Sequence, residues 1–283
     1  MSTSSFRLDG KTIAMTGAAG ILGQGAIAAF LEAGARVCAL DRSTADLDKL
    51  GPDGERLLKI ATDVSDPAGV RAAADRLHAH WGVADVLFNN AATKSENFFA
   101  PFEEFPLADW NEVMAVNLTG AMLCAQAFGG AMAKRGRGAV VNTLSIYGIV
   151  APDQRIYEGS EYLGRPINTP AIYSASKAGL WGLTQYLASY WGAQGVRVNA
   201  ITPGGVFSGQ NETFVRNYSQ RVPLGRMASG EDIVNGMLFL ASDASSYLNG
   251  HNLVVDGGLV GGRMWSVQQA SLVAMKQTFG SDQ

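Results

Sequence analysis

The stretch TIAMTGAAGILG at residues 12–23 joins a short apolar run to a glycine-rich turn and then to a helix-length segment. Residues 12–16 have the composition of a strand, and residues 21–33 the pattern of a helix. Glycines at such a turn let the backbone approach a pyrophosphate, whose charge then lies at the helix N-terminus. Alone the turn is a weak signal, because the chain contains 34 glycines. The predicted dinucleotide contacts in this turn are Gly17, Ala19, Gly20, Ile21, Leu22 and Gly23.

The alternation of short apolar runs and helix-length segments continues along the chain. Strands are predicted at residues 12–16, 36–41, 57–62, 85–89, 139–145, 197–201 and 252–255. Helices are predicted at residues 21–33, 67–80, 107–135, 172–193 and 231–242. The strand runs are apolar on both faces, as expected when helices cover both sides of a parallel sheet. We therefore predict an α/β protein with one Rossmann-type, doubly wound parallel sheet of about seven strands and helices on both faces. Residues 1–283 are expected to form a single catalytic domain.

Composition narrows the classes of function. Hydrophobic residues make up 47% of the chain and charged residues 17%, which suits a large core and not a disordered chain. The formal net charge of −3 gives no electrostatic reason to expect nucleic acid or an anionic membrane as a partner. No apolar run approaches the ~20 residues of a membrane helix, and the N-terminus lacks a secretory signal. We expect a cytoplasmic protein with buried thiols at Cys38 and Cys124 and no metal site.

An acidic residue ends the second predicted strand. Asp41 lies 18 residues beyond Gly23, where a carboxylate can accept hydrogen bonds from ribose hydroxyls and would repel a 2′-phosphate. This predicts NAD as the cofactor; Arg42 leaves NADP as a less favoured choice, and capping of the next helix is the alternative role for Asp41. Ligands of such sheets bind beyond the carboxyl ends of the strands, although residues there can also be simple turn-formers. The further predicted cofactor contacts are Arg42, Asp63, Val64, Asn90, Ala91, Ala92, Pro203, Gly204 and Val206.

Candidate reacting groups lie in the second half of the chain. Tyr173 and Lys177 are four residues apart on a predicted helix, so the ammonium can lie near the phenol. A tyrosine of pKa ~10 is a poor base at neutral pH, but a nearby ammonium and an oxidised nicotinamide favour the phenolate. Ser145 ends the fifth predicted strand, where its hydroxyl can bind a substrate oxygen. Asn117 lies inside the predicted helix 107–135; asparagine is a poor helix former, so we expect it to kink the helix and hold a water.

The motifs taken together resemble the classical short-chain dehydrogenase/reductase family over about residues 8–260. They are TGAAGILG, Asn89-Asn90-Ala91, Asn117, Ser145, Tyr173-x3-Lys177, Pro203-Gly204 and Val255-Asp256-Gly257-Gly258. The resemblance implies a catalytic tetrad of Asn117, Ser145, Tyr173 and Lys177. It implies that Tyr173 exchanges the alcohol proton while hydride passes to or from nicotinamide C4, and that Ser145 orients the oxygen. Lys177 would lower the pKa of Tyr173 and bind the nicotinamide ribose, so both residues also belong to the cofactor site. Asn117 would hold a proton-relay water, and the chain would form a homotetramer or homodimer.

The glycine turn departs from the family pattern. The usual form is TGxxxGxG, whereas Gly20 and Gly23 give TGxxGxxG, which is more typical of the extended branch with its nucleotide-sugar epimerases and dehydratases. Those enzymes carry a substantial C-terminal substrate domain, and only 25 residues follow Gly258 here, so we favour the classical branch. An epimerase or dehydratase with retained NAD, and a non-catalytic NAD-binding protein, are the alternatives.

Ser145 and Tyr173 are 28 residues apart, about twice the spacing in many relatives, so residues 151–170 are predicted to be an insertion beside the substrate. The insertion is polar, with aromatic and cationic side chains, and this favours a small hydrophilic substrate such as a sugar, polyol or sugar acid. An anionic substrate could pair with Lys94, Arg155 or Arg165; alternatively these charges are solvated or hold the insertion together. The predicted substrate contacts are Lys94, Ser145, Tyr147, Arg155, Tyr173 and Gly205.

The insertion and neighbouring stretches also resemble a bacterial subgroup linked to carbohydrate and surface-glycan metabolism. We therefore predict an NAD-dependent oxidoreductase that interconverts a secondary alcohol and a ketone. The apolar tail, residues 261–283, is expected to pack on the core or on a neighbouring subunit.

Overall fold

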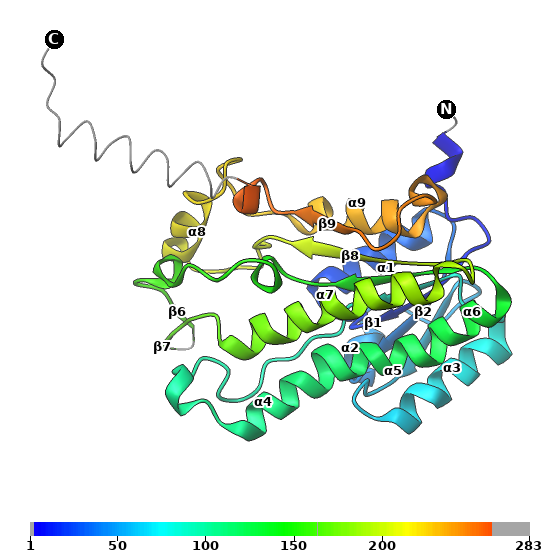
Figure 1. Ribbon diagram of the computed structural model, residues 1–283, viewed down its shortest axis with the longest axis horizontal. Helices are drawn as coiled ribbons and strands as arrows, with labels where there is room; N and C mark the ends of the chain where they lie inside the picture. Colours follow the sequence, from blue (N-terminus) through cyan, green and yellow to red (C-terminus); the bar gives the residue numbers. More distant parts are fainter. Residues whose placement is uncertain (1–2, 163, 262–283) are drawn as a thin grey trace, which may run out of the picture.

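The computed structural model describes residues 3–162 and 164–261, and a parallel sheet runs through its centre (Figure 1). Within these residues the sheet has seven strands in the order β3-β2-β1-β4-β5-β8-β9. The strands are β1 Thr12–Thr16, β2 Arg36–Asp41, β3 Leu57–Ala61, β4 Val86–Asn89, β5 Gly138–Thr143, β8 Val196–Pro203 and β9 Asn252–Val255. Each neighbouring pair is parallel. The predicted doubly wound sheet is confirmed, and the strand order reverses between β1 and β4, where such sheets bind ligands.

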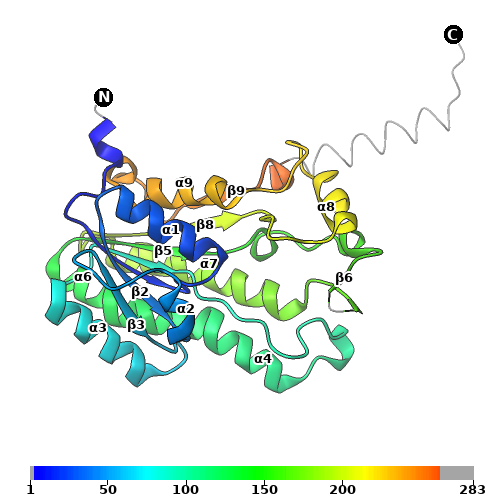
Figure 2. The ribbon, with the colours of Figure 1, turned by 180° about the vertical axis from the view of Figure 1, so that it is seen from behind.

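Helices cover both faces of the sheet (Figures 1 and 2). One face carries α1 Ile21–Glu32, α2 Thr44–Asp48 and α9 Gly230–Ala241. The other carries α3 Pro67–Trp81, a long helix built from α4 Leu107–Met114, α5 Ala121–Cys124 and α6 Gly130–Arg135, and α7 Ala171–Gly192. Alternate residues of one strand enter the two cores: Ile13 and Met15 pack against α1 and α9, whereas Ala14 faces α3 and α7. Both faces are buried, which explains why the strand sequences are apolar throughout.

Residues 107–135 form one continuous helix with π-helical turns at Ala115–Gly120 and Ala125–Gly129. The helix has 29 residues and a mean hydropathy of 1.3 in its most apolar window, so it is long and apolar enough to cross a membrane by these two measures. The expectation that no apolar run approaches the length of a membrane helix is therefore wrong. Phe128 and Met132 are fully buried in the core on the α3 side, and 44% of the apolar window lies inside the protein. This role as a core helix accounts for the apolar residues on the buried face of the helix.

Several short elements were not predicted from the sequence. They are α2, α8 Glu212–Ser219, a 3₁₀ turn at Gln154–Tyr157 and the hairpin of β6 Glu161–Tyr162 with β7 Arg165–Pro166. Each spans too few residues to show a hydrophobic period. The predicted fifth strand also ends earlier than expected: Ser145 lies after β5, and its Oγ accepts a hydrogen bond from Tyr147 N at 3.3 Å. Apart from Gly261, the tail at residues 261–283 lies outside the described residues.

Candidate active site

A cleft of about 1140 Å³ runs along the carboxyl ends of the strands. Its walls come from the segments that follow β1, β2, β3, β4, β5 and β8, as the sheet topology requires. The predicted site residues that line it are Gly17, Ala19, Gly20, Ile21, Leu22, Asp41, Arg42, Asp63, Val64, Asn90, Ala91, Ala92, Lys94, Ser145, Tyr147, Tyr173, Lys177, Pro203, Gly204, Gly205 and Val206. Three predicted residues, Gly23, Asn117 and Arg155, are not part of the lining.

Two glycines of the first turn are required by packing. Gly17 has φ 63°, and a Cβ there would lie 2.8 Å from Ala91 Cα. A Cβ on Gly23 would lie 2.3 Å from Gly17 O, so this glycine lets α1 pack directly on the turn. A Cβ on Gly20 would come no closer than 3.3 Å to its neighbours. A Cβ at Gly20 would thus make a tight contact that a small shift could relieve, whereas a Cβ at Gly17 or Gly23, the two glycines shared with the family pattern, would clash with backbone atoms.

The end of the cleft beside α1 fits a dinucleotide. No side chain in the described residues caps the N-terminus of α1, and Gly20 and Ile21 line the cleft there. An uncapped helix N-terminus attracts an anion such as a pyrophosphate. Asp41 also lines the cleft, and Ala19 N donates to its Oδ2 at 3.0 Å, which fixes the carboxylate against the turn. The residues present therefore fit the cofactor that the turn predicts, with pyrophosphate at α1 and ribose at Asp41.

The Thr16 hydroxyl connects the backbone segments at this end of the site, although no role was predicted for this residue from the sequence. Its Oγ1 accepts hydrogen bonds from Asn90 N at 3.0 Å and Ala91 N at 3.1 Å, and donates to Phe88 O at 3.3 Å. Asn90 Nδ2 in turn donates to Gly17 O at 3.1 Å. These bonds join the ends of β1 and β4 on either side of the point where the strand order reverses. This role could have been predicted from the sequence, because Thr16 is a hydroxyl residue that ends an apolar strand directly before a glycine.

Tyr173, Lys177 and Ser145 meet at the other end of the cleft. Lys177 Nζ lies 6.0 Å from the centroid of the Tyr173 ring and donates to Thr143 O at 2.8 Å. Burial raises the pKa of the Tyr173 phenol, and a side-chain hydrogen bond with Ser145 opposes this rise. Burial lowers the pKa of Lys177 to about 8. The cleft by itself therefore favours the neutral phenol, and a phenolate needs additional positive charge beside it.

Asn117 lies in the first π-helical turn and is 1% exposed. Its Oδ1 accepts a hydrogen bond from Thr93 N at 3.0 Å, and its Nδ2 donates to Ser176 Oγ at 3.2 Å. The side chain thus joins the loop after β4 to α7, next to Lys177. At this position the structure has a π-helical turn, a feature frequent at functional sites.

The two arginines of the insertion, Arg155 and Arg165, do not line the cleft. Arg155 forms an ion pair with Asp153 at 2.8 Å, with its side chain 71% exposed, and Asp153 also pairs with Arg221 beyond α8. The prediction that Arg155 contacts substrate is therefore replaced by the alternative, in which it holds the insertion together. Arg165 is likewise exposed on β7 and outside the lining. Lys94 does line the cleft, with Nζ 5.5 Å from the Phe99 ring centroid.

Other residues line the substrate end without having been predicted to do so. They are Phe98, Tyr157, Ile167, Thr169, Phe214 and Tyr218.

Cys38 and Cys124 are free and buried, and burial raises the pKa of each thiol to about 12, so neither is a reactive nucleophile. Among residues 3–162 and 164–261, no three His, Cys, Asp or Glu side chains gather in a way that could hold a metal ion.

Residues 17–260 match a family model described as enoyl-(acyl carrier protein) reductase. A D-threitol dehydrogenase of Mycolicibacterium smegmatis is 37% identical over 262 residues, which cover 89% of this chain and 94% of that protein. The chain belongs to the classical short-chain dehydrogenase/reductase family. The resemblance inferred from the motifs is thereby confirmed, and a short-chain dehydrogenase is an oxidoreductase that acts on CH–OH groups.

Solved structures of short-chain dehydrogenases agree in fold and bind either nicotinamide cofactor. One from Leptospira borgpetersenii serovar Hardjo-bovis, with bound NAD+, has a TM-score of 0.81 and 34% identity, covering 92% of this chain and 96% of its own. A gluconate 5-dehydrogenase from Burkholderia cenocepacia J2315, in complex with NADP and tartrate, has a TM-score of 0.79 and 31% identity, covering 91% and 98%. These relatives support a nicotinamide cofactor for this short-chain dehydrogenase and leave open which one it prefers.

Proposed function

We propose that this short-chain dehydrogenase interconverts a secondary alcohol and its ketone on a polyol, sugar or sugar acid, with NAD as the preferred cofactor. The observation that carries the proposal is the meeting of Tyr173, Ser145 and Lys177 at one end of a cleft whose other end fits a dinucleotide. Relatives named for threitol and gluconate support the substrate class. Neither of these is an epimerase or a dehydratase, so that alternative is not favoured.

The cofactor lies, in this proposal, between the α1 end of the cleft and Lys177. Bound there, it supplies hydride transfer at nicotinamide C4. The glycine turn and the N-terminus of α1 hold the pyrophosphate, Asp41 accepts hydrogen bonds from the adenosine ribose, and Asp63 and Val64 contact the adenine. Asn90, Ala91 and the turn at residues 203–206 pack around the nicotinamide half.

The chain's own residues handle the proton. Tyr173 Oη accepts the alcohol proton during oxidation and returns it during reduction, while Ser145 Oγ hydrogen-bonds the substrate oxygen. The Lys177 ammonium favours the phenolate and binds the nicotinamide ribose. Asn117 keeps a proton-relay water in place from its position between Thr93 and Ser176, on the helix beside Lys177.

The preference for NAD is tested at Asp41. A carboxylate fixed at this point repels a 2′-phosphate, so Asp41→Asn, which retains an oxygen to accept from Ala19 N, removes the repulsion and keeps the turn. The ratio of kcat/KM with NAD to kcat/KM with NADP should fall by about ten-fold or more. Steady-state kinetics with both cofactors measure it. An unchanged ratio would remove Asp41 from the ribose role.

The function itself is tested by following reduced nicotinamide absorbance with purified protein, NAD or NADP, and a panel of polyols, sugars and sugar acids. We expect reduction of NAD with at least one polyol or sugar compound. If NAD binds, as shown by calorimetry, and yet no member of the panel is oxidised, the proposed substrate class is wrong.

We further propose a single catalytic domain, with residues 151–170 on the substrate side, that works in the cytoplasm without a nucleic-acid or membrane partner. We propose a homotetramer or homodimer packed through the long helix 107–135 and α7. In support, Tyr186 and Tyr190 stack on the exposed face of α7, with ring centroids 5.6 Å apart and planes 14° apart.

A further inference from the structure

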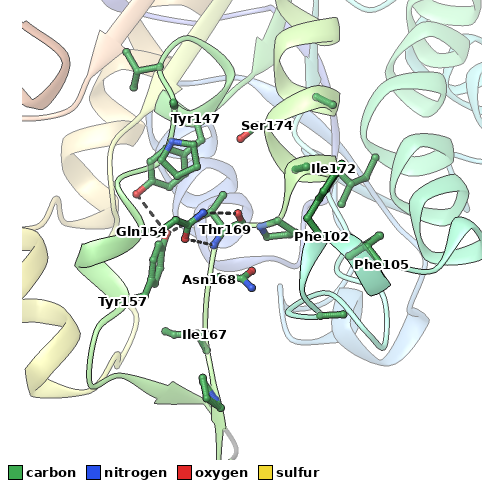
Figure 3. A pocket seen from close by; sticks show the side chains of 18 of the residues that line it. Phe102, Phe105, Tyr147, Gln154, Tyr157, Ile167, Asn168, Thr169, Ile172 and Ser174 are labelled. Atoms are coloured by element: carbon green, nitrogen blue, oxygen red, sulfur yellow. Dashed lines mark hydrogen bonds between the residues drawn. The ribbon is translucent and has the colours of Figure 1, made fainter.

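Three hydroxyl groups cluster at the substrate end of the cleft. Tyr157 Oη lies 3.4 Å from Tyr147 Oη and forms a short hydrogen bond with Thr169 Oγ1 (Figure 3). All three residues line the cleft that contains Tyr173, and all three also line a second cavity of about 1060 Å³ on the other side of residues 167–170. The cluster therefore forms part of a thin wall beside the reacting tyrosine. Tyr157 is close enough to Tyr173 that a charge on it would raise the pKa of the Tyr173 phenol.

The cluster is held rigidly by contacts from two sides. The Tyr157 ring packs on Phe214 of α8, with ring centroids 5.6 Å apart. Gln154 Nε2 donates to Thr169 O at 3.1 Å, which fixes the backbone of the wall (Figure 3). Asn217 on α8 donates through Nδ2 to the carbonyls of residues 156 and 158, at 3.3 and 3.1 Å. The hydroxyl of Tyr157 thus has a defined place in the cleft and does not depend on a mobile loop.

The chemistry of the cluster matches a hydroxyl-bearing ligand. Each hydroxyl is both a donor and an acceptor, so a chain of three can admit one more hydroxyl from a substrate. An oxidation at one carbinol needs only Tyr173 and Ser145 at the reacting oxygen. An apolar substrate in the cleft would remove water from this cluster and offer its hydroxyls no further hydrogen bond, which costs binding free energy relative to a hydroxylated substrate.

We propose that Tyr157, supported by Thr169 and Tyr147, binds a second hydroxyl of the substrate near the reacting carbon, so that the enzyme selects polyols over simple secondary alcohols. The inference rests on the proposed function and extends it. Tyr157 acts in specificity and binding, and no proton of the reaction passes through it.

The test compares two substrates in two variants of the cluster and one control variant. Tyr157→Phe removes one hydroxyl and keeps the ring that packs on Phe214. With a polyol that the wild type oxidises, kcat/KM should fall by about ten-fold or more, mainly through KM. With the analogue that lacks the hydroxyl next to the reacting carbon, kcat/KM should stay within about two-fold. Thr169→Val should likewise lower kcat/KM for the polyol more than kcat/KM for the analogue. Tyr247→Phe, which removes a fully exposed hydroxyl after α9, is the matched control.

The outcomes separate this inference from the function on which it rests. Thermal stability and NAD affinity of Tyr157→Phe should equal those of the wild type, which shows that the variant folds. Equal losses with the polyol and its deoxy analogue, or no loss with either, would overturn the inference while leaving the proposed function intact. A wild-type enzyme that oxidises no polyol at all would overturn both.

Discussion

Tyr173 lies where its neutral form is favoured, because burial raises the pKa of the phenol more than its hydrogen bond with Ser145 lowers it. The same burial lowers the pKa of Lys177 to about 8, so the ammonium beside the phenol is itself held only weakly at mildly alkaline pH. At the scale of single residues, we therefore expect Tyr173 to act as a base only when a cationic ligand occupies the cleft. In the proposed mechanism, proton transfer by Tyr173 therefore depends on a cofactor bound at the other end of the cleft.

A pH profile tests that dependence. Oxidation needs the phenolate of Tyr173, so kcat/KM for the alcohol at saturating NAD should rise with pH as the phenol loses its proton. The Lys177 ammonium stabilises the phenolate, so in Lys177→Met the rising limb should move to higher pH by about one unit or more. Initial rates between pH 6 and 10 measure the rising limb in the wild type and in Lys177→Met. Limbs at the same pH in the two proteins would show that Lys177 does not tune Tyr173.

At the scale of elements, apolar strands and long helices could be predicted from sequence, and short helices could not. The bounds of β1, β2 and β9 match their predicted ranges, and the glycine turn, Asp41 and Tyr173 were located because each directly follows or opens such a segment. Elements α2 and α8 were missed because five to eight residues show too little periodicity.

The prediction that Arg155 of the insertion contacts the substrate was wrong for a different physical reason. The role of Arg155 depends on which charge it meets, and the partner proved to be Asp153, only two residues away. The wall residue Tyr157 packs on Phe214 of α8, which lies more than fifty residues later in the chain. No local pattern encodes contacts between segments so far apart in sequence.

The link between α8 and the insertion carries an element-scale prediction. Asn217→Ala removes the two hydrogen bonds to the carbonyls of residues 156 and 158, and this loosens the substrate wall without touching the glycine turn. KM for the alcohol should rise by about three-fold to ten-fold while KM for NAD stays within about two-fold. Steady-state kinetics with each substrate varied in turn measure this split. Arg216→Ala, an exposed neighbour on α8, is the control; equal rises in both KM values for Asn217→Ala would contradict the account.

At the scale of the whole molecule, one side of the fold presents unusually apolar helices. The most apolar window of the helix 107–135 has a mean hydropathy of 1.3, and less than half of that window is buried in the described part of the chain. On α7 beside it, Tyr186 and Tyr190 are 62% and 58% exposed. Apolar surface of this kind is stabilised when another copy of the chain covers it.

The formation of a dimer or tetramer is therefore predicted to depend on the exposed face of the helix 107–135 and α7. Light scattering coupled to size-exclusion chromatography should give the wild type a mass two or four times that of the 29.8 kDa chain. Replacing both tyrosines, Tyr186→Glu with Tyr190→Glu, places charges in the proposed interface and should lower the mass at micromolar concentration. Tyr247→Glu, on a fully exposed loop, should leave it unchanged. A wild type with the mass of one chain would contradict the proposed assembly.

The central claim, that Tyr173 transfers the proton in a nicotinamide-dependent oxidation, is tested most directly by the turnover of Tyr173→Phe. The variant keeps the ring that packs edge-on to Phe98, with centroids 6.2 Å apart, and removes only the hydroxyl. We predict that kcat for the polyol falls by about a thousand-fold or more, while NAD affinity by calorimetry and the thermal midpoint remain those of the wild type. A variant that retains most of the wild-type turnover would contradict the assignment of Tyr173 and, with it, the mechanism built on this cleft.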